Sequence, residues 1–168
     1  AAGGQGAPLV PAFHEAILRN KEITRVVLNL GGMANITVLP AEQTQIVYGY
    51  DTGPANVLMD AWCQKKLQQA FDKNGVWAAS GTVNTDLLAE MLAHPFFAKK
   101  PPKSTGREDF HIDWLMTLLE AGYANILAED VQATLLALTA QSVADAVIKT
   151  DFTTGELWLC GGGAYNQA

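Results

Sequence analysis

The sequence VVLNLGGMANITVLP, from Val26 to Pro40, predicts two β-strands separated by a glycine pair. Residues 23–30 are rich in β-branched side chains, and residues 34–39 alternate as a half-buried strand does. Residues 45–50 read as a third strand after a short link. Three consecutive strands with short connections predict an antiparallel meander.

The periodicity changes to that of helices after residue 50. In residues 51–71, Pro54 suits the first helical turn, and Thr52 or Gly53 suits the N-cap. Further helices are predicted over residues 13–20, 84–93, 112–121 and 130–148, the last capped by Asp130, and loops over residues 1–12, 72–81 and 94–109. The longest helix is apolar around most of its surface and should lie between layers. A final strand over residues 156–160 completes a layered α/β domain with a mixed sheet.

Composition narrows the class of protein. The chain of 168 residues fits one domain, and with 49% hydrophobic residues it can bury a core without disulfides. A net charge of −6 argues against a nucleic-acid binder, and no apolar run approaches the roughly 20 residues of a membrane span. Charged residues make up only 17%, against roughly 25% in soluble domains, which favours a surface shared with another domain or subunit. The isolated cysteines Cys63 and Cys160 are typical of buried thiols in a cytoplasmic protein.

The glycine pair Gly31-Gly32 has two interpretations. It is either a tight hairpin turn, in which glycine supplies a positive φ, or a place where backbone N–H groups are presented to a phosphate. In the second case the side chains of Asn35 and Thr37 would add hydrogen-bond donors.

The stretch YGYDTGPAN, residues 48–56, places a carboxylate between a strand and a helix N-terminus. The free N–H groups at such a terminus favour an anion or a polar ligand. The alternative is that Asp51 simply caps the helix and that Asn56 is an ordinary surface residue.

The stretch KKPPKSTGRED, residues 99–109, holds four of the 11 basic residues. Either it is a solvated loop, or Arg107 is held rigidly to pair with a carboxylate or phosphate, for which its planar guanidinium is suited.

The end of the chain, LWLCGGGAYN, runs a strand into three glycines and a polar helix start. It resembles the dinucleotide fingerprint but has Asn166 where a third spaced glycine is required. The other interpretation is a glycine-rich turn that binds a purine or a ribose. His14, His94 and His111 are far apart in the sequence, so we expect no metal site from them.

Six motifs together resemble one family. The segments AAGGQGAPLVPAFH, LNLGGMANIT, YDTGPANVLMDAW, STGREDF, QATLLALTA and CGGGAYN, in this order, are similar to the anhydro-N-acetylmuramic acid kinase family. That family belongs to the actin-like sugar kinase superfamily, whose domains have a ribonuclease-H-like fold. The similarity extends over essentially the whole chain.

The resemblance implies an enzyme that uses ATP and Mg²⁺ to open the 1,6-anhydro ring of anhydro-N-acetylmuramic acid and to phosphorylate O6. The product, N-acetylmuramic acid 6-phosphate, is an intermediate of peptidoglycan recycling. Gly31, Gly32 and Asn35 would bind phosphate. The triple glycine, Gly161, Gly162 and Gly163, would bind adenosine together with Asn166. The residues expected to face the substrate cleft are Gln5, Asp51, Thr52 and Arg107.

The resemblance also implies what this chain lacks. In the family, a catalytic aspartate precedes the glycine stretch that opens this sequence. We therefore expect that aspartate just upstream of Ala1, and no catalytic residue within residues 1–168. We expect these residues to be a single domain, most of the C-terminal lobe of a two-lobed homodimeric kinase, and to be inactive alone. The alternatives are another sugar or acyl-phosphate kinase of the same superfamily, and a non-catalytic nucleotide- or sugar-binding module.

Overall fold

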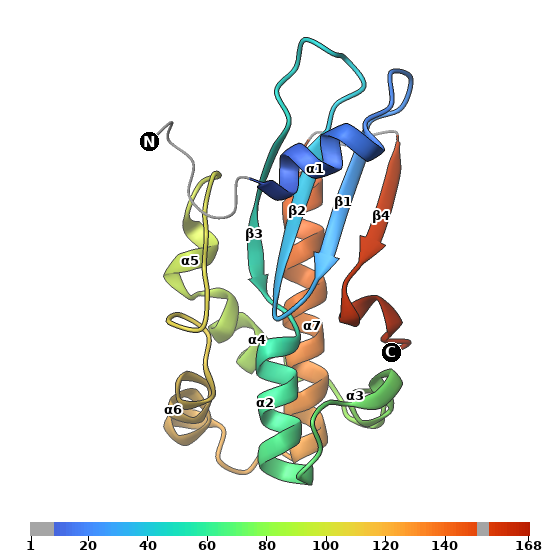
Figure 1. The fold of residues 1–168 in the computed structure, drawn as a ribbon. Coiled ribbons are helices and arrows are strands. Elements are labelled where there is room, and N and C mark those ends of the chain that lie inside the picture. The colour runs from blue at the N-terminus through green and yellow to red at the C-terminus, as the bar shows by residue number, and fades with distance from the viewer. Residues whose placement is uncertain (1–8, 151–154) are drawn as a thin grey trace.

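A computed structural model describes residues 9–150 and 155–168. Its sheet has four strands in the order β3-β2-β1-β4, namely β1 (Arg25–Leu30), β2 (Met33–Leu39), β3 (Tyr48–Pro54) and β4 (Glu156–Cys160) (Figure 1). β1 pairs antiparallel with β2, β2 pairs antiparallel with β3, and β4 pairs parallel with β1. The predicted meander and mixed sheet are therefore confirmed.

The third strand lies later in the sequence than expected. β3 extends through Pro54, because its pairing with β2 continues to Met33 opposite Pro54. Helix α2 (Asn56–Leu67) begins after it, with Ala55 as an N-cap that makes no side-chain cap hydrogen bond. The predictions that Pro54 lies in the first helical turn and that Thr52 or Gly53 is its N-cap are therefore wrong.

Of the remaining helices, three match their predicted ranges closely, one begins and ends earlier than predicted, and two short ones were not predicted. They are α1 (Leu9–Leu18), α3 (Val76–Ser80), α4 (Thr85–Leu92), α5 (Pro95–Ala98), α6 (Ile112–Gly122) and α7 (Ala128–Ile148), with 3₁₀ turns at Lys73–Gly75 and Gly162–Tyr165. Three expected loops thus contain helix. The Asp72 carboxylate accepts from the backbone N–H groups of Trp77 and Ala78 and so begins α3, and the His94 ring accepts from Phe96 N and begins α5. α1 begins at Leu9, inside the expected N-terminal loop. α7 begins at Ala128 with Leu127 as N-cap, so Asp130 lies within the helix and is not its cap.

Helix α7 joins two hydrophobic clusters. Its C-terminal half packs Val143 and Ala146 against the sheet, whereas its N-terminal half places Leu135 and Leu138 among the helices α2, α4 and α6. Among the described residues it is the one helix long and apolar enough, by length and composition, to cross a membrane. Because it contacts β2, β3 and three helices, we assign it to the core, as its all-round apolar pattern predicts.

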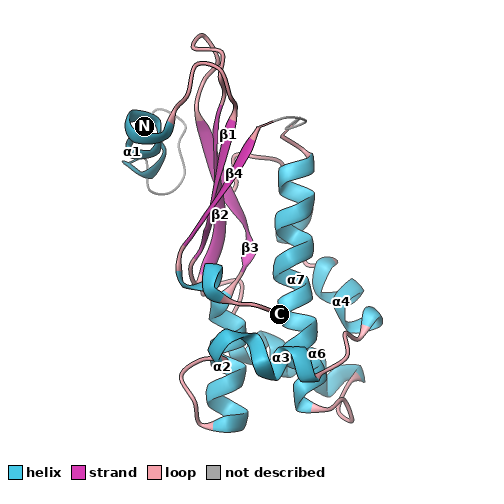
Figure 2. Cartoon of the chain, turned by 90° about the vertical axis from the view of Figure 1, so that its right-hand side faces the viewer, coloured by secondary structure: helices cyan, strands magenta, loops and turns pink. Residues whose placement is uncertain are grey.

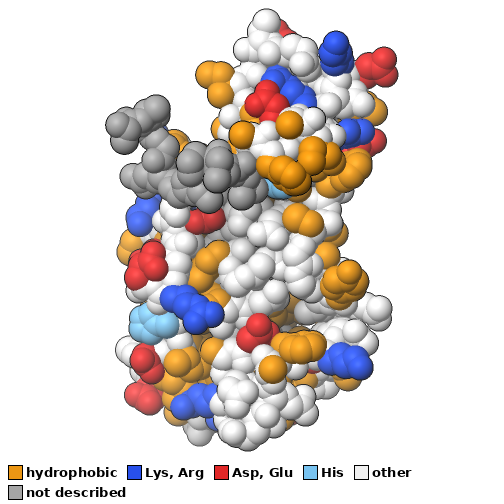
Figure 3. Space-filling view, viewed as in Figure 1, with side chains coloured by type: hydrophobic (Ala, Val, Ile, Leu, Met, Phe, Trp, Pro, Cys, Tyr) orange, Lys and Arg blue, Asp and Glu red, His pale blue; other side chains and the backbone are white. Residues whose placement is uncertain are grey.

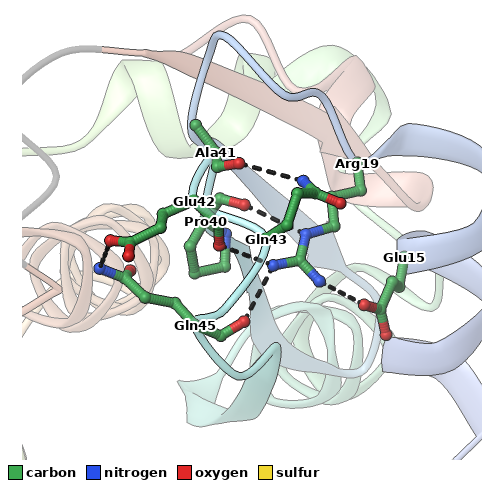
Figure 4. A network of polar contacts seen from close by, with 7 residues as sticks. All are labelled: Glu15, Arg19, Pro40, Ala41, Glu42, Gln43 and Gln45. Atoms are coloured by element: carbon green, nitrogen blue, oxygen red, sulfur yellow. Dashed lines mark hydrogen bonds and ion pairs between the residues drawn. The ribbon is translucent and has the colours of Figure 1, made fainter.

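Helix α1 covers the opposite face of the sheet from α7 (Figure 2). The buried His14 side chain bonds through Nδ1 to the hydroxyl of Thr37 at 3.0 Å. Arg19 donates to the carbonyl oxygens of Pro40, Glu42 and Gln45 in the β2–β3 loop and pairs with Glu15 (Figure 4). The Arg19 guanidinium therefore connects α1 to the β2–β3 loop, and His14 connects it to β2.

Some apolar side chains remain on the surface. Hydrophobic side chains gather over α1 on one face (Figure 3), where Phe13 and Ile17 are each 61% exposed. The outer strand β4 exposes Leu157, Trp158 and Leu159. This is consistent with the low charge content of the chain.

Candidate functional site

The two glycine bends lie side by side. Because β1 and β4 are parallel neighbours, with Asn29 opposite Cys160, both strands end at the same edge of the sheet. The approach is so close that a β-carbon placed on Gly161 would lie 2.6 Å from Asn29 Oδ1 and 2.7 Å from the Leu30 carbonyl oxygen. The carboxyl ends of parallel strands are a common place for ligands in α/β proteins.

The Gly31-Gly32 bend holds the beginning of α2. The backbone N–H groups of Ala55 and Val57 donate to the Gly32 carbonyl at 3.0 and 3.1 Å, and that of Asn56 donates to the Gly31 carbonyl at 3.1 Å. The N–H groups of Asn56 and Val57, the first two of this helix, therefore already have acceptors and are not free for an anion, whereas the prediction of an anion at this helix terminus is otherwise untested. Neither Gly31 nor Gly32 has a positive φ, so the hairpin explanation in its φ-based form is wrong.

A cavity of about 590 Å³ opens beside this bend. We call it the Gly31 cavity, and its walls include Gly31, Gly32, Asn56, Asp60 and Arg107. Across residues 9–150 and 155–168, the structure gives the exposed Arg107 no ion-pair partner. The glycine pair and the arginine, 75 positions apart in the sequence, thus border one space. A guanidinium beside two glycines is suited to a phosphate or carboxylate.

A second cavity, of about 520 Å³, adjoins the triple glycine. We call it the Gly162 cavity, and its walls include Gly162, Gly163, Asn166, Gln132 and the aromatic rings of Phe71 and Tyr165. Asn166 Oδ1 accepts from Ala168 N at 3.0 Å. The four residues predicted to bind adenosine are thus together, with Gly161 at the strand end and the other three in the cavity wall.

Asn56 and Asp60 line both cavities, so the two spaces adjoin along one face of α2. Asn56 Nδ2 donates to the Leu30 carbonyl at 3.1 Å. Burial raises the pKa of the Asp60 carboxyl above its ordinary value. A ligand that extends through both cavities would therefore pass an amide and a carboxylate, one helical turn apart.

Two predicted cleft residues lie away from these cavities. The Asp51 carboxylate accepts from the Ser104 hydroxyl at 2.9 Å and from Thr105 N at 3.0 Å, which joins β3 to the loop before Arg107. It does not cap α2, because it lies inside β3. Thr52 is buried and donates to the Ala34 carbonyl at 3.3 Å. The assignment of both residues to the substrate cleft stays a prediction.

Two further expectations concern the beginning of the chain. Gln5 was expected in the substrate cleft, and the catalytic aspartate was expected just upstream of Ala1. Ala1 and Gln5 both lie outside the described residues, which begin at residue 9. Neither the cleft position of Gln5 nor the aspartate before Ala1 is therefore tested by the structure, and both stay predictions.

The donors expected beside the glycine pair are only partly in position. Asn35 is half-buried in β2, opposite Asn29 and Asp51, and its role stays a prediction. The Thr37 hydroxyl is bonded to His14 beneath α1, which removes Thr37 from the candidate phosphate donors.

The basic stretch divides between two places. Arg107 borders the Gly31 cavity, whereas Lys99, Lys100 and Lys103 border a separate cavity of about 340 Å³ between α5, β3 and α7. Burial, with the neighbouring Lys149 and Lys99, lowers the pKa of Lys103, whose ammonium donates to the Phe96 carbonyl at 3.3 Å. Of these four basic residues, only Arg107 therefore lines a cavity beside a glycine bend.

Both cysteines are free thiols, but only Cys63 is buried. The expectation that both are buried is wrong for Cys160, because β4 is an outer strand. In the part of the chain that the structure describes, no three His, Cys, Asp or Glu side chains gather closely enough to hold a metal ion alone.

Asp60 and Gln132 line the candidate cavities but are not predicted by the sequence patterns, which leave Asn56 as an ordinary surface residue. Asn56 and Asp60 carry a sequence signal, because residues four apart share a helix face. Gln132 carries no such signal, because α7 also contains polar residues, such as Gln141, that lie on its exposed face.

Comparisons with known proteins agree on one family. The family model described as anhydro-N-acetylmuramic acid kinase matches residues 1–168. Curated relatives with that name include proteins of Acinetobacter baylyi (55% identical over 99% of this chain and 46% of the relative), Xanthomonas axonopodis pv. citri (54%, 99% and 43%) and Coxiella burnetii (51%, 99% and 44%). The chain therefore spans less than half the length of these relatives.

Proposed function

The chain belongs to the anhydro-N-acetylmuramic acid kinase family, and from that premise we propose that it forms one side of a cleft for ATP and a sugar. The observation that carries the proposal is the pair of glycine bends at one sheet edge, beside two adjoining cavities. The triphosphate would lie in the Gly31 cavity near Arg107, and the nucleoside in the Gly162 cavity. We also propose that the sheet and its helices are part of a ribonuclease-H-like domain.

The proposed reaction is phosphoryl transfer coupled to ring opening. A base takes a proton from water, which attacks the anomeric carbon of anhydro-N-acetylmuramic acid and becomes its hydroxyl group. The bond from that carbon to O6 breaks, and O6 takes the γ-phosphoryl group of ATP. The products are N-acetylmuramic acid 6-phosphate and ADP. Phosphoryl transfer requires the protein mainly to position two substrates and to stabilise spread negative charge. Arg107 and the glycine backbone are suited to that task in this chain.

We propose that the nucleotide binds together with Mg²⁺. In phosphoryl-transfer sites magnesium is commonly held by one or two carboxylates together with substrate phosphates. Asp60 lines both cavities and is the residue of this chain that we assign to that position. Bound Mg²⁺ would neutralise phosphate charge. The positive charge would also favour the ionised form of Asp60, opposing the effect of burial on its pKa.

The rest of the enzyme would come from a segment outside these residues. We propose that the chain is most of the C-terminal lobe, that the aspartate that activates water lies just upstream of Ala1, and that the whole protein is a cytoplasmic homodimer that acts in cell-wall recycling. The exposed apolar side chains of α1 and β4 support covering by another lobe or subunit.

The test uses the full-length protein that carries this chain. With ATP and anhydro-N-acetylmuramic acid, we expect a product heavier by one phosphoryl group and one water, detected by mass spectrometry. N-acetylglucosamine as the acceptor should give little product, and residues 1–168 alone should give none. Phosphorylation of N-acetylglucosamine in preference to the anhydro sugar would contradict the proposal, and normal rates from the isolated chain would contradict the assignment of a missing lobe.

A further inference from the structure

Gln132 is a buried amide without a hydrogen-bond partner. It lies in the second turn of α7, its side chain is 0% exposed, and neither Oε1 nor Nε2 is bonded to any of the described residues. Both atoms belong to a side chain that forms part of the wall of the Gly162 cavity. Buried polar groups in folded proteins are almost always paired, so a group without a partner requires an explanation, and its position at a cavity wall favours a bound ligand as that explanation.

The other buried polar side chains show that this is an exception. Each of them makes a side-chain hydrogen bond within the described residues, as the threonines of α7 illustrate. Thr134 donates to the Asp130 carbonyl at 2.6 Å, and Thr139 donates to the Pro54 carbonyl at 3.1 Å. The remaining members of the set are His14, Thr37, Thr52, Thr105 and Ser142. Gln132 alone of the set has no such bond, and it is one of the residues that line the Gly162 cavity.

The chemistry of a carboxamide limits what the ligand can be. It presents one acceptor and one donor side by side in a plane. A phosphate or a carboxylate only accepts, so it would leave Oε1 unpaired. The edge of adenine offers an amino donor next to a ring-nitrogen acceptor, and glutamine pairs with both at once. The rings of Phe71 and Tyr165 in the same wall provide flat apolar surface for a base.

We infer that Gln132 hydrogen-bonds the amino edge of a purine base in the Gly162 cavity and thereby selects adenine. The inference rests on the proposed function, which puts the nucleoside in that cavity. Asn56 and Asp60 form the wall common to both cavities, so a base bound at Gln132 directs its phosphates toward Gly31 and Arg107. Gln132 is thus a specificity-determining residue that acts by direct contact with the nucleotide.

The test compares nucleotides with and without the amino group. For the full-length wild-type protein, calorimetry should show ATP bound roughly tenfold or more tightly than purine riboside triphosphate, which has hydrogen in place of the amino group. In Gln132→Met we expect the ATP affinity to fall by about the same factor and the ratio between the two nucleotides to approach one. Inorganic tripolyphosphate should bind both proteins equally.

Gln141→Met is the matched control, because Gln141 lies on the exposed face of α7 and bonds Asp145. It should keep the wild-type ratio. Gln132→Met should unfold at a temperature at or above that of the wild type, because it removes an unpaired buried amide. Equal binding of the two nucleotides by the wild type, which needs no variant, would overturn the inference, as would an unchanged ratio in Gln132→Met. If the wild type shows no kinase activity with ATP, the proposed function fails instead.

Discussion

The two glycine bends resemble each other in sequence and differ in what the backbone does. At Gly161, φ is +85° and ψ is 171°, a conformation that is essentially restricted to glycine. A β-carbon there would also collide with backbone atoms of Leu30. At Gly31 and Gly32 φ is not positive, and a β-carbon would meet only ordinary contacts of 3.5 Å or more.

A glycine can be required by the backbone conformation or can leave space beside the backbone, and the two bends differ in which of these applies. The triple-glycine bend needs at least one glycine for folding, because β4 lies against the end of β1 with no room between them. At the Gly31-Gly32 bend the fold has room for a β-carbon, and the contribution of the bend to the fold is its carbonyl groups, which accept hydrogen bonds from the start of α2. We therefore propose that the missing side chains at Gly31-Gly32 leave space for a ligand in the adjoining Gly31 cavity.

The largest effect is expected from Gly161→Ala. A non-glycine residue in that conformation, together with contacts of 2.6 and 2.7 Å, should lower the free energy of unfolding by about 2–4 kcal/mol. Urea unfolding of the purified variant measures this. Gly162→Ala is the control within the same bend, because its β-carbon would meet only Asn56 Nδ2, at 3.7 Å, and should change stability by about 0.5 kcal/mol or less. Equal losses in the two variants would show that the bend has no special constraint at Gly161.

Gly32→Ala should act on the ligand and not on the fold. Its β-carbon would lie 3.9 Å from Val57 Cβ, so we expect the free energy of unfolding to change by about 0.5 kcal/mol or less. In the full-length protein the added methyl group narrows the Gly31 cavity, and we expect ATP affinity to fall about tenfold, as measured by calorimetry. Unchanged ATP affinity would mean that Gly31-Gly32 is only a turn and that these glycines have no role in ligand binding.

Sequence periodicity was enough for most of the framework. β1, β2, β4 and the helices α4, α6 and α7 are within about two residues of their predicted ranges, because each is a distinct apolar run or a segment with a regular apolar period. β3 was misplaced because the strand's end depends on its register with β2, which local sequence does not contain. α3 was missed because Asp72 begins it from several residues upstream.

The sequence predicted individual motifs of the candidate site, but not which of them lie close together in the fold. Motifs pointed to the glycine bends and to Arg107 one at a time, and the parallel pairing of β1 with β4 brings the bends together. Gln132 was not predictable, because a glutamine in a long helix is usually a surface residue and only the packed structure shows that its amide lacks a partner.

Asn56→Ala tests the residue that joins the two bends. Its side chain donates to the Leu30 carbonyl, and its backbone N–H donates to Gly31. Removing the amide should cost about 1 kcal/mol of unfolding free energy. Asn56→Asp keeps the shape but cannot donate, so it should be at least as destabilised in urea. If both variants are as stable as the wild type, Asn56 does not connect the bends.

The smallest effect is expected from Asp60→Asn, beside both bends. Burial holds the pKa of Asp60 above the ordinary value of about 3.9, so as pH rises the unfolded chain loses this proton before the folded protein does. The stability contributed by protonated Asp60 is therefore present at low pH and is lost as pH rises through the folded-state pKa. Asp60→Asn without nucleotide should remove that slope and be slightly more stable than the wild type at pH 7, in urea unfolding repeated across pH. Glu120→Gln, on the exposed surface of α6, is the matched control for the removal of one carboxylate. An Asp60→Asn protein that is less stable than the wild type at pH 7 would mean that a cationic group pairs with this carboxylate in the free protein, and the Mg²⁺ assignment would have to be abandoned.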